Sequence, residues 1–138
     1  MQRYVVDASV ILKWVLGDER ESDQDKALAL LNTWVEGRSE LLAPGLWEYE
    51  VGNFLGRLFP GEASAKMNLL VSLKLSSIPL TEEMHRLCFD WMSQNGVTFY
   101  DACYLALAEE TMSILVTADA KFAEKMGHPK SVCLLEDL

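Results

Sequence analysis

The sequence has no apolar stretch that is long enough to span a membrane. Its first apolar run stops at Asp7 and is too short for a secretory signal peptide. Cysteine is scarce as well, and Cys88, Cys103 and Cys133 are widely spaced and odd in number, which predicts neither a disulfide framework nor a zinc site. Together these absences indicate a protein of a reducing compartment, with a cytoplasmic location as the default expectation.

Positive charge is also in short supply, since 12 Lys and Arg stand against 21 Asp and Glu and the formal net charge is -9. Because nucleic-acid binding depends on clustered Lys and Arg, this balance argues against a general nucleic-acid coat protein. A nuclease is not excluded, since bound metal ions can supply positive charge locally. The sequence has no glycine-rich phosphate loop and no Ser-His-Asp or Cys-His set, and His85 and His128 are isolated.

What the sequence does contain is an alternation of short apolar runs and amphipathic segments over 138 residues, half of them hydrophobic. This length predicts one domain, residues 1–138, with a substantial core. Strands are expected at 3–7, 41–43, 77–80, 114–116 and 132–135. Helices are expected at 9–16, from a Ser22 or Asp23 cap to Gly37, and at 46–58, 62–75, 82–95, 98–110 and 119–126, with a break at 17–20. The alternation favours a parallel sheet with helices on both faces.

Four acidic residues occupy special places in this pattern. Asp7 follows the first strand, Asp119 follows the strand at 114–116, and Glu50 and Asp101 lie near the starts of expected helices. Each has an ordinary structural explanation, because Asp is a preferred N-cap, Thr98-x-x-Asp101 is close to a capping box, and Glu50 can be a solvated helix residue. In open α/β sheets, however, ligands bind beyond the carboxyl ends of the strands, which is where Asp7 and Asp119 fall.

If the four carboxylates meet at that edge, their repulsion is large: a like-charge pair at about 4 Å costs roughly 4 kcal/mol at an effective dielectric of about 20. Such a cluster must raise its pKa values or bind cations. Mg²⁺ and Mn²⁺ are the hard ions that prefer oxygen ligands, and two such ions can activate water and stabilise the leaving oxygen in phosphodiester cleavage. Spacing in the sequence alone does not establish that the four acids converge.

Four segments of the chain resemble the motifs of one family. They are Val5-Val6-Asp7-Ala8-Ser9; Ala43-Pro44 through Leu46-Trp47 to Glu50-Val51-x-Asn53; Thr98-x-Tyr100-Asp101-Ala102-x-Tyr104-Leu105-Ala106-x-Ala108; and Leu115-Val116-Thr117-x-Asp119-x-x-Phe122. These segments resemble the motifs of PIN-domain proteins, in the order of that family and over nearly the whole chain, and the third is the most specific. The short length is similar to that of the VapC-type toxins, the ribonuclease half of toxin–antitoxin pairs.

The resemblance implies a PIN-like three-layer α/β/α fold, with a central parallel sheet of about four to five short strands, and an endoribonuclease activity that depends on Mg²⁺ or Mn²⁺. It implies that Asp7 and Asp101 are the main metal ligands and that Asp119 binds the metal as well or holds a metal-bound water. Glu50 is implied as a further catalytic acid, as a ligand or as a base that positions water. It also implies an RNA substrate, an antitoxin partner and a homodimer.

Three polar residues stand beside the four acids and are predicted to support them. Ser9 and Thr117 lie at the two strand ends, where their hydroxyls are expected to orient Asp7 or Asp119 or to contact the phosphate. Asn53 lies one helical turn beyond Glu50, on nearly the same face, and is expected to support it.

So acidic a ribonuclease needs local basic residues to hold RNA, and those nearest to the motifs are Lys13, Arg20, Arg57, Lys121 and Lys125. Two other interpretations stay open at this point. The chain is consistent with a stand-alone RNA-processing nuclease, and with a degenerate PIN domain that binds a partner without catalysis.

Overall fold

A five-stranded sheet in the order β3-β2-β1-β4-β5 lies at the centre of the computed structural model, which describes residues 1–17 and 22–138. The strands are β1 (Gln2–Val6), β2 (Ser39–Pro44), β3 (Ser76–Ile78), β4 (Ile114–Thr117) and β5 (Val132–Leu134). Neighbouring strands all pair in parallel, and β1 lies in the middle, in register with both β2 and β4. The predicted fold class is therefore confirmed.

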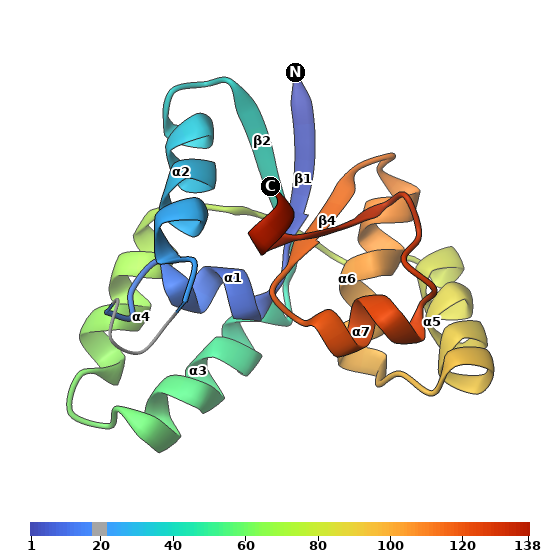
Figure 1. Ribbon diagram of the computed structural model, residues 1–138. Helices are drawn as coiled ribbons and strands as arrows, with labels where there is room; N and C mark the ends of the chain where they lie inside the picture. The colour runs from blue at the N-terminus through green and yellow to red at the C-terminus, as the bar shows by residue number, and fades with distance from the viewer. Residues whose placement is uncertain (18–21) are drawn as a thin grey trace.

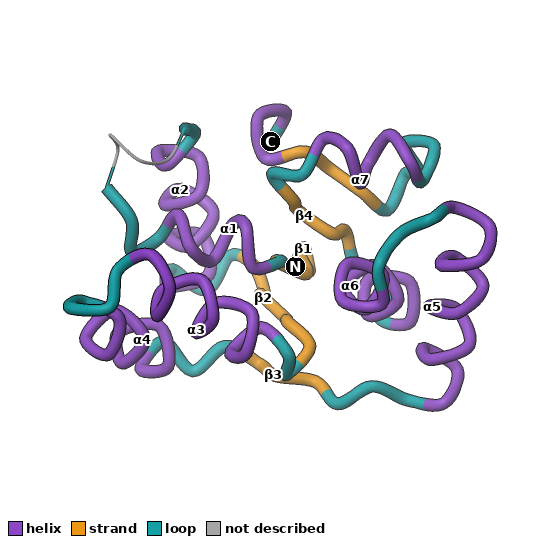
Figure 2. Tube along the Cα trace, turned by 90° about the horizontal axis from the view of Figure 1, so that it is seen from below, coloured by secondary structure: helices purple, strands orange, loops and turns teal. Residues whose placement is uncertain are grey.

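Helices cover both sides of this sheet (Figures 1 and 2). One side carries α1 (Ala8–Lys13), α2 (Gln24–Val35), α3 (Trp47–Leu58) and α4 (Ala63–Ser72), and the other carries α5 (Glu82–Asn95), α6 (Phe99–Glu110) and α7 (Ala120–Lys125). A 3-10 helix, η1 (Leu135–Asp137), follows β5. None of the helices in the described part of the chain combines the length and the apolar character needed to cross a lipid bilayer.

The path of the chain changes direction beside β1. From β1 it moves outward to β2 and β3, with α1 to α4 on one side, and then returns through α5 and α6 on the opposite side to place β4 against the free edge of β1. Connections that leave neighbouring strands toward opposite faces create a crevice at the carboxyl ends of these strands. The topology therefore puts a crevice at the ends of β1 and β4.

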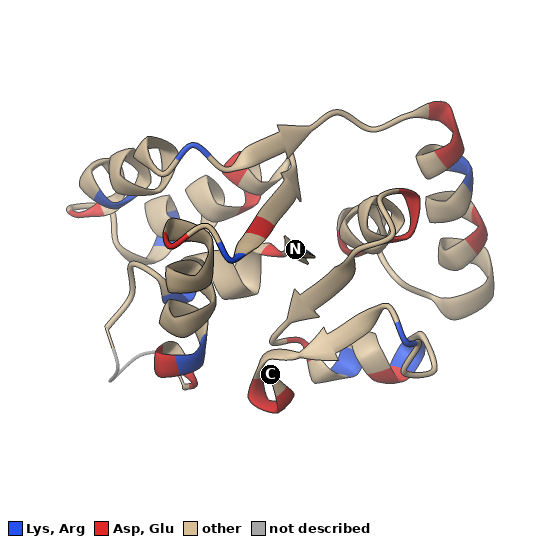
Figure 3. Ribbon diagram, turned by 90° about the horizontal axis from the view of Figure 1, so that it is seen from above, with Lys and Arg blue, Asp and Glu red and all other residues tan. Residues whose placement is uncertain are grey.

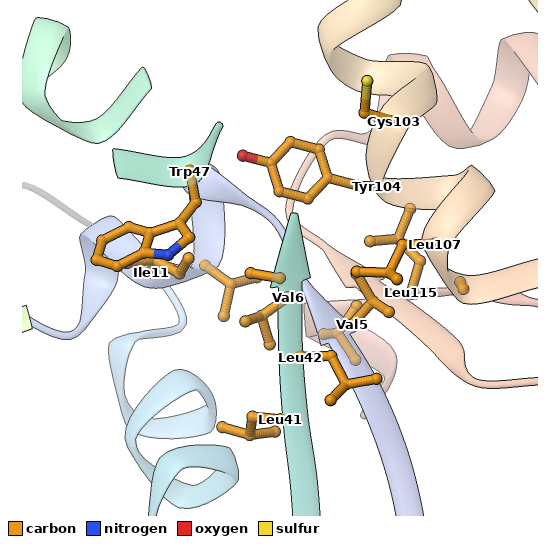
Figure 4. Packing of buried hydrophobic residues seen from close by; sticks show 14 of the residues in the cluster. Val5, Val6, Ile11, Leu41, Leu42, Trp47, Cys103, Tyr104, Leu107 and Leu115 are labelled. Carbon is orange, nitrogen blue, oxygen red and sulfur yellow. The ribbon is translucent and has the colours of Figure 1, made fainter. Parts of the chain in front are cut away.

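The central strands carry continuous apolar runs because their side chains there are buried on both faces of the sheet. Val5 and Val6 of β1 and Leu115 and Val116 of β4 are buried side by side, because both faces of a parallel sheet are covered by helices. Helix α6 is the most central helix, with all residues from Ala102 to Ala108 buried. Figure 4 shows side chains from β1, β2, β4, α1, α3 and α6 that meet in this core.

Both ends of α5 show the capping that the sequence predicts. The Thr81 hydroxyl accepts a hydrogen bond from the backbone N–H of Met84 at 3.2 Å and begins α5. Gly96 ends the same helix with a φ of 67°, a left-handed conformation that glycine adopts without strain. Other helix ends differ from the predicted ones by a few residues; for example, α1 ends at Lys13 rather than at Leu16.

At the start of α2 the position of the predicted cap is correct, but its side chain does not act as one. Asp23 occupies the N-cap position of α2, but its backbone is left-handed with a φ of 57°, and its side chain makes no capping hydrogen bond. A capping side chain normally extends from the β region of the backbone, which directs its oxygen to the first free N–H groups. Of the expected break at 17–20, only Gly17 lies within the described residues.

Candidate active site

Each of the four acids belongs to the start of a helix at the carboxyl edge of the sheet. Asp7 is the N-cap of α1 and accepts from the N–H of Val10 at 3.3 Å, and Asp119 is the N-cap of α7 and accepts from the N–H of Phe122 at 3.0 Å. Glu50 and Asp101 lie in the first turns of α3 and α6. The positive ends of helix dipoles favour carboxylates at such positions.

The four carboxylates line one pocket, with a volume of about 410 Å³. The other residues around this acidic pocket are Ala8, Ser9, Leu12, Lys13, Phe54, Tyr104 and Ala118. The convergence that the sequence left open therefore occurs. For Asp7 and Asp119, the capping explanation and the pocket explanation both hold, because the same carboxylate does both.

Asp7 is held by two hydroxyl groups, one on each of its oxygens. Ser9 Oγ donates to Oδ1 at 2.5 Å, and Thr117 Oγ1 donates to Oδ2. Both hydroxyls also accept backbone hydrogen bonds at 3.0 Å, Ser9 from the N–H of Ala118 and Thr117 from the N–H of Asp119. Ser9 and Thr117 thus fix the orientation of Asp7 and join the end of β1 to the start of α7.

Glu50 has a partner that the sequence reasoning did not single out. Tyr104 Oη donates to Glu50 Oε1 at 2.6 Å, and only 2% of the Tyr104 side chain is exposed. Figure 4 shows the Tyr104 hydroxyl pointing away from α6, over the ends of the strands. The available signal was its position three residues after Asp101, which places both on one face of α6.

Burial and mutual repulsion raise the pKa values of three of these carboxyls. Burial raises the pKa of Asp7 from 3.8 to about 6, although hydrogen bonds from Ser9, Thr117 and Val10 oppose the shift. Burial also raises the pKa of Glu50, against the hydrogen bond from Tyr104.

Asp101 is the electrostatic centre of the group. Burial raises its pKa, the Asp119 carboxylate raises it further, and Thr98 and Lys125 lower it. The charge of Asp101 in turn raises the pKa values of Asp7 and Glu50. Each of the four acids therefore either perturbs, or is perturbed by, another member of the set.

The predicted basic residues lie around the acidic pocket in three places. Lys13 lines it, and its Nζ donates to the carbonyl of Ser22 at 2.8 Å. Arg57 lies in an adjacent pocket, and Lys121 and Lys125 in another. Figure 3 shows basic residues on α7 and on the α1–α4 side of the sheet. Arg20 lies outside the described residues.

Among the pockets that share residues with the acidic pocket, two contain its carboxylates. The tyrosine pocket consists of Tyr49, Glu50, Asn53, Phe54, Arg57 and Tyr100. The lysine pocket consists of Val97, Thr98, Asp101, Asp119, Lys121, Phe122 and Lys125. Asn53 thus lies beside Glu50 in the tyrosine pocket, while the hydrogen bond to Glu50 comes from Tyr104.

The donor set fits a hard divalent cation in its chemistry. It offers carboxylate oxygens from four residues around one pocket, and no ion pair between described residues involves any of them. Divalent Mg²⁺ and Mn²⁺ prefer such oxygen ligands. Within the described part of the chain, no three acids, histidines or cysteines already form a compact ligand group. The fit therefore rests on the oxygen donors and on their unneutralised charge.

The fold and the pocket define an α/β protein with four carboxylates at the switch point of a parallel sheet. The family model of the PIN domain matches residues 4–127, and the chain belongs to this family.

Three similar proteins illustrate the membership. The chain is 34% identical over 130 residues to a protein named ribonuclease VapC3 from Pyrobaculum aerophilum, a match that covers 89% of this chain and 94% of the relative. It is 33% identical over 99 residues to exonuclease VapC9 of the same organism, covering 67% and 71%. A toxin–antitoxin complex from Klebsiella pneumoniae contains a chain of the same fold, with a TM-score of 0.70, 12% identity and coverage of 98% and 99%.

Proposed function

We propose that this protein is a Mg²⁺- or Mn²⁺-dependent endoribonuclease that hydrolyses RNA phosphodiester bonds, as the toxin of a type II toxin–antitoxin pair. The observation that carries this proposal is the convergence of Asp7, Glu50, Asp101 and Asp119 in one pocket at the switch point. Membership in the PIN family and the relative named ribonuclease VapC3 support it. The chain acts as one domain, in the cytoplasm.

In this proposal, Asp7, Asp101 and Asp119 bind the metal through their carboxylate oxygens. The bound cation would lower the pKa of a nearby water and neutralise charge that develops on the phosphate. Ser9 and Thr117 keep both oxygens of Asp7 in a fixed direction. Their hydrogen bonds are of the kind that outer residues provide around a metal ligand.

Glu50 is placed to act on the attacking water. Its Oε1 accepts from Tyr104, which holds the side chain in the acidic pocket, and its second oxygen accepts no hydrogen bond from the described residues. Glu50 orients a water or accepts its proton, as a ligand or as a base. Because burial raises its pKa, the carboxyl is a better proton acceptor than an exposed Glu.

RNA cleavage by the purified protein, with and without divalent metal, tests this function. We expect cleavage only with Mg²⁺ or Mn²⁺, and its loss in Asp7→Asn and in Asp101→Asn, whose circular dichroism should match the parent. Asp90→Asn, at an exposed position of α5, is the matched control and should cleave normally. Cleavage that survives EDTA, or full activity in either site variant, would contradict the mechanism.

A circular RNA separates endonuclease from exonuclease action, which matters because one relative is named an exonuclease. A circle has no end at which an exonuclease can begin. Linearisation of the circle is therefore the expected result. A circle that stays intact while the linear form is degraded would show that the endonuclease assignment is wrong.

An antitoxin is the protein partner in this proposal, as the complex from Klebsiella pneumoniae suggests. An antitoxin Arg would bind the unneutralised carboxylates as a bidentate donor. A small neighbouring gene with a DNA-binding start and a basic tail should encode it, and its product should inhibit cleavage. Without such a gene, the stand-alone RNA-processing alternative is favoured.

We also propose that the protein is a homodimer. Leu58 of α3 and Leu69 and Val71 of α4 are exposed by 50%, 62% and 47%. Exposed apolar side chains that gather on neighbouring helices are typical of a protein–protein interface. Sedimentation should give a dimer at micromolar concentration, and Leu69→Lys should shift it toward monomer. A monomeric parent protein would exclude this assembly.

A further inference from the structure

The tyrosine pocket lies directly beside the acidic pocket and has a volume of about 440 Å³. Helix α3 provides five of its six residues, and Tyr100 at the start of α6 completes it. Glu50 and Phe54 belong to both pockets. A ligand in the tyrosine pocket is therefore next to the carboxylates, with no intervening element.

Two exposed tyrosine rings and an exposed amide line this pocket, and the Tyr100 ring contacts Phe99 edge-on with 6.4 Å between the ring centroids. Tyr49 is 81% exposed and Tyr100 is 60% exposed, and neither phenol forms a hydrogen bond with the described residues. Asn53 is exposed as well, and its amide has no hydrogen bond within the described part of the chain. A ligand that packs on exposed aromatic rings removes their apolar surface from water, which favours binding.

Arg57 adds a cation at the same place. The ion pairs between described residues engage the cations Arg3, Arg38, Lys66 and Arg86, and none of them engages Arg57. Nor does any hydrogen bond join the Arg57 side chain to a described residue. In a chain of net charge -9, Arg57 thus places a positive charge beside the acidic pocket without an ion pair to any described acid. Guanidinium groups bind phosphates as bidentate donors and stack on planar bases.

We propose that the tyrosine pocket binds a nucleobase of single-stranded RNA, in the nucleotide adjacent to the bond that is cut. The base stacks on Tyr49 or Tyr100, Asn53 hydrogen-bonds to its edge, and Arg57 binds the neighbouring phosphate. Unpaired bases are commonly recognised in this way, by aromatic stacking together with side-chain hydrogen bonds to their edges. This inference rests on the proposed ribonuclease function, because the carboxylates give the pocket its place along the strand.

The lysine pocket indicates where the RNA backbone continues beyond the acidic pocket. The lysine pocket, about 170 Å³, shares Asp101 and Asp119 with it and contains Lys121 and Lys125. The three pockets are therefore contiguous, with cations at both ends and carboxylates in the middle. The RNA backbone would run from Arg57, across the carboxylates, to the two lysines.

A second copy of the chain and an antitoxin are the alternatives to RNA as occupants of the tyrosine pocket. The exposed aliphatic surface at Leu69 and Val71, on α4, is the better interface between copies, since protein interfaces favour apolar cores. The tyrosine pocket instead combines ring faces, an amide and a cation. This set matches the ring, the edge and the phosphate of a nucleotide.

Binding without cleavage tests the pocket. In an Asp7→Asn background, we would measure fluorescence anisotropy of a labelled single-stranded RNA of about eight nucleotides, a length within common site sizes. Tyr49→Ala and Tyr100→Ala are expected to weaken binding, roughly 5- to 100-fold at the ring that carries the base. Tyr49→Phe and Tyr100→Phe keep the ring and should keep the affinity.

Arg57→Ala should weaken binding and reduce its dependence on salt, because one phosphate contact is lost. The matched control is Arg38→Ala, which removes an exposed Arg just before β2. This Arg lies at the amino end of the strand, whereas the acidic pocket lies at the carboxyl ends. It should bind RNA like the parent.

An abasic scan locates the base. Replacing one nucleotide at a time by an abasic residue should weaken binding most at a single position in the Asp7→Asn protein. In the alanine variant of the stacking tyrosine, that position should no longer matter, since the base has lost its partner. An alanine variant with the same abasic profile as its parent would overturn the inference.

The remaining outcomes separate this inference from the proposed function. If the tyrosine variants bind RNA normally but change sedimentation or lose the antitoxin, the pocket is a protein interface and the inference fails. If binding depends on the tyrosines but the wild-type protein cuts no RNA, the ribonuclease proposal fails and the base pocket stands. If the protein binds no single-stranded RNA, the inference is wrong whatever its enzymatic activity.

Discussion

At the scale of single residues, the acidic pocket depends on neutral neighbours as much as on its acids. Ser9, Thr117 and Tyr104 each donate a hydrogen bond to a carboxylate of the pocket. Burial would otherwise leave those carboxylates with desolvated oxygens. Two of the three donors, Ser9 and Thr117, were predicted as supporting residues, and both donate to Asp7.

Thr117→Val removes the donor to Asp7 Oδ2 and the acceptor for the N–H of Asp119 without changing side-chain shape. Thr117 is fully buried, so the loss should lower the free energy of unfolding by about 1–3 kcal/mol. Activity or metal affinity should fall about 10- to 100-fold. Denaturant unfolding and single-turnover cleavage measure both, with Thr33→Val on α2 as control. Equal activity in Thr117→Val and the parent would remove Thr117 from the site.

Tyr104→Phe removes the hydroxyl that donates to Glu50 and leaves the ring in the core. Because this hydrogen bond lowers the pKa of Glu50, the variant should have a Glu50 pKa that is raised further above its ordinary value. The acidic limb of the kcat/KM profile should therefore move to higher pH, while activity at high pH changes less. Tyr4→Phe, at a tyrosine without a described hydrogen bond, is the control. An unchanged profile would exclude a role for Tyr104 in the ionisation of Glu50.

At the scale of elements, helix starts are the units that build this site. Four helices begin at the carboxyl edge, and each brings its acid in the cap or the first turn. A change that loosens one helix start should therefore disturb the site as well as the fold.

Thr98→Ala tests this dependence, because Thr98 accepts from the N–H of Asp101 at 3.1 Å and begins α6. Loss of the cap should lower the free energy of unfolding by about 1 kcal/mol. Thr98 also lowers the pKa of Asp101, so its removal should weaken metal binding near neutral pH. Thr81→Ala, which removes the corresponding cap of α5, should lose similar stability and keep full metal affinity by calorimetry. Identical metal affinity in both variants would contradict the link.

Element by element, the sequence allowed most of this to be predicted, because apolar runs, capping threonines and glycine stops act locally. Asp7, Thr81, Thr98 and Gly96 are all found in the capping roles that their types favour. Asp23 is the N-cap of α2 as expected but makes no capping hydrogen bond, because its left-handed backbone directs the side chain elsewhere. Tyr104 was missed because its partner Glu50 lies on α3, about 50 residues away. The tyrosine pocket was missed because it joins residues of α3 to Tyr100 of α6.

At the scale of the whole molecule, the strand order decides whether the acids form a site. Asp7 and Asp119 meet only because β4 pairs with β1 rather than adding to the edge beside β3. Local patterns do not encode this choice of neighbour. The resemblance to PIN domains supplied the expectation that the four acids converge, and the strand order explains how they do so.

The same convergence should leave a signature in stability. The Asp7 carboxyl has a pKa of about 6 in the folded protein against 3.8 ordinarily, so the folded state binds the proton more tightly. The free energy of unfolding should therefore fall as pH rises from about 4 to about 6, by up to about 3 kcal/mol from this group. Asp7→Asn removes the ionisation, and should be more stable than the parent above pH 6 and equal to it below about pH 4.

Divalent metal should reverse that order. At about 1,000 times the dissociation constant, bound Mn²⁺ stabilises the folded parent by about 4.1 kcal/mol, which exceeds the deficit of up to about 3 kcal/mol, whereas Asp7→Asn should gain much less. Denaturant unfolding at pH 5, 6 and 8, with EDTA and with Mn²⁺, measures the effect, and Asp90→Asn on α5 is the control for loss of one negative charge. Because protons compete for the same oxygens, stabilisation by Mn²⁺ should weaken as pH falls through 6. Parallel curves for the parent and Asp7→Asn, with and without Mn²⁺, would mean that Asp7 is only a helix cap.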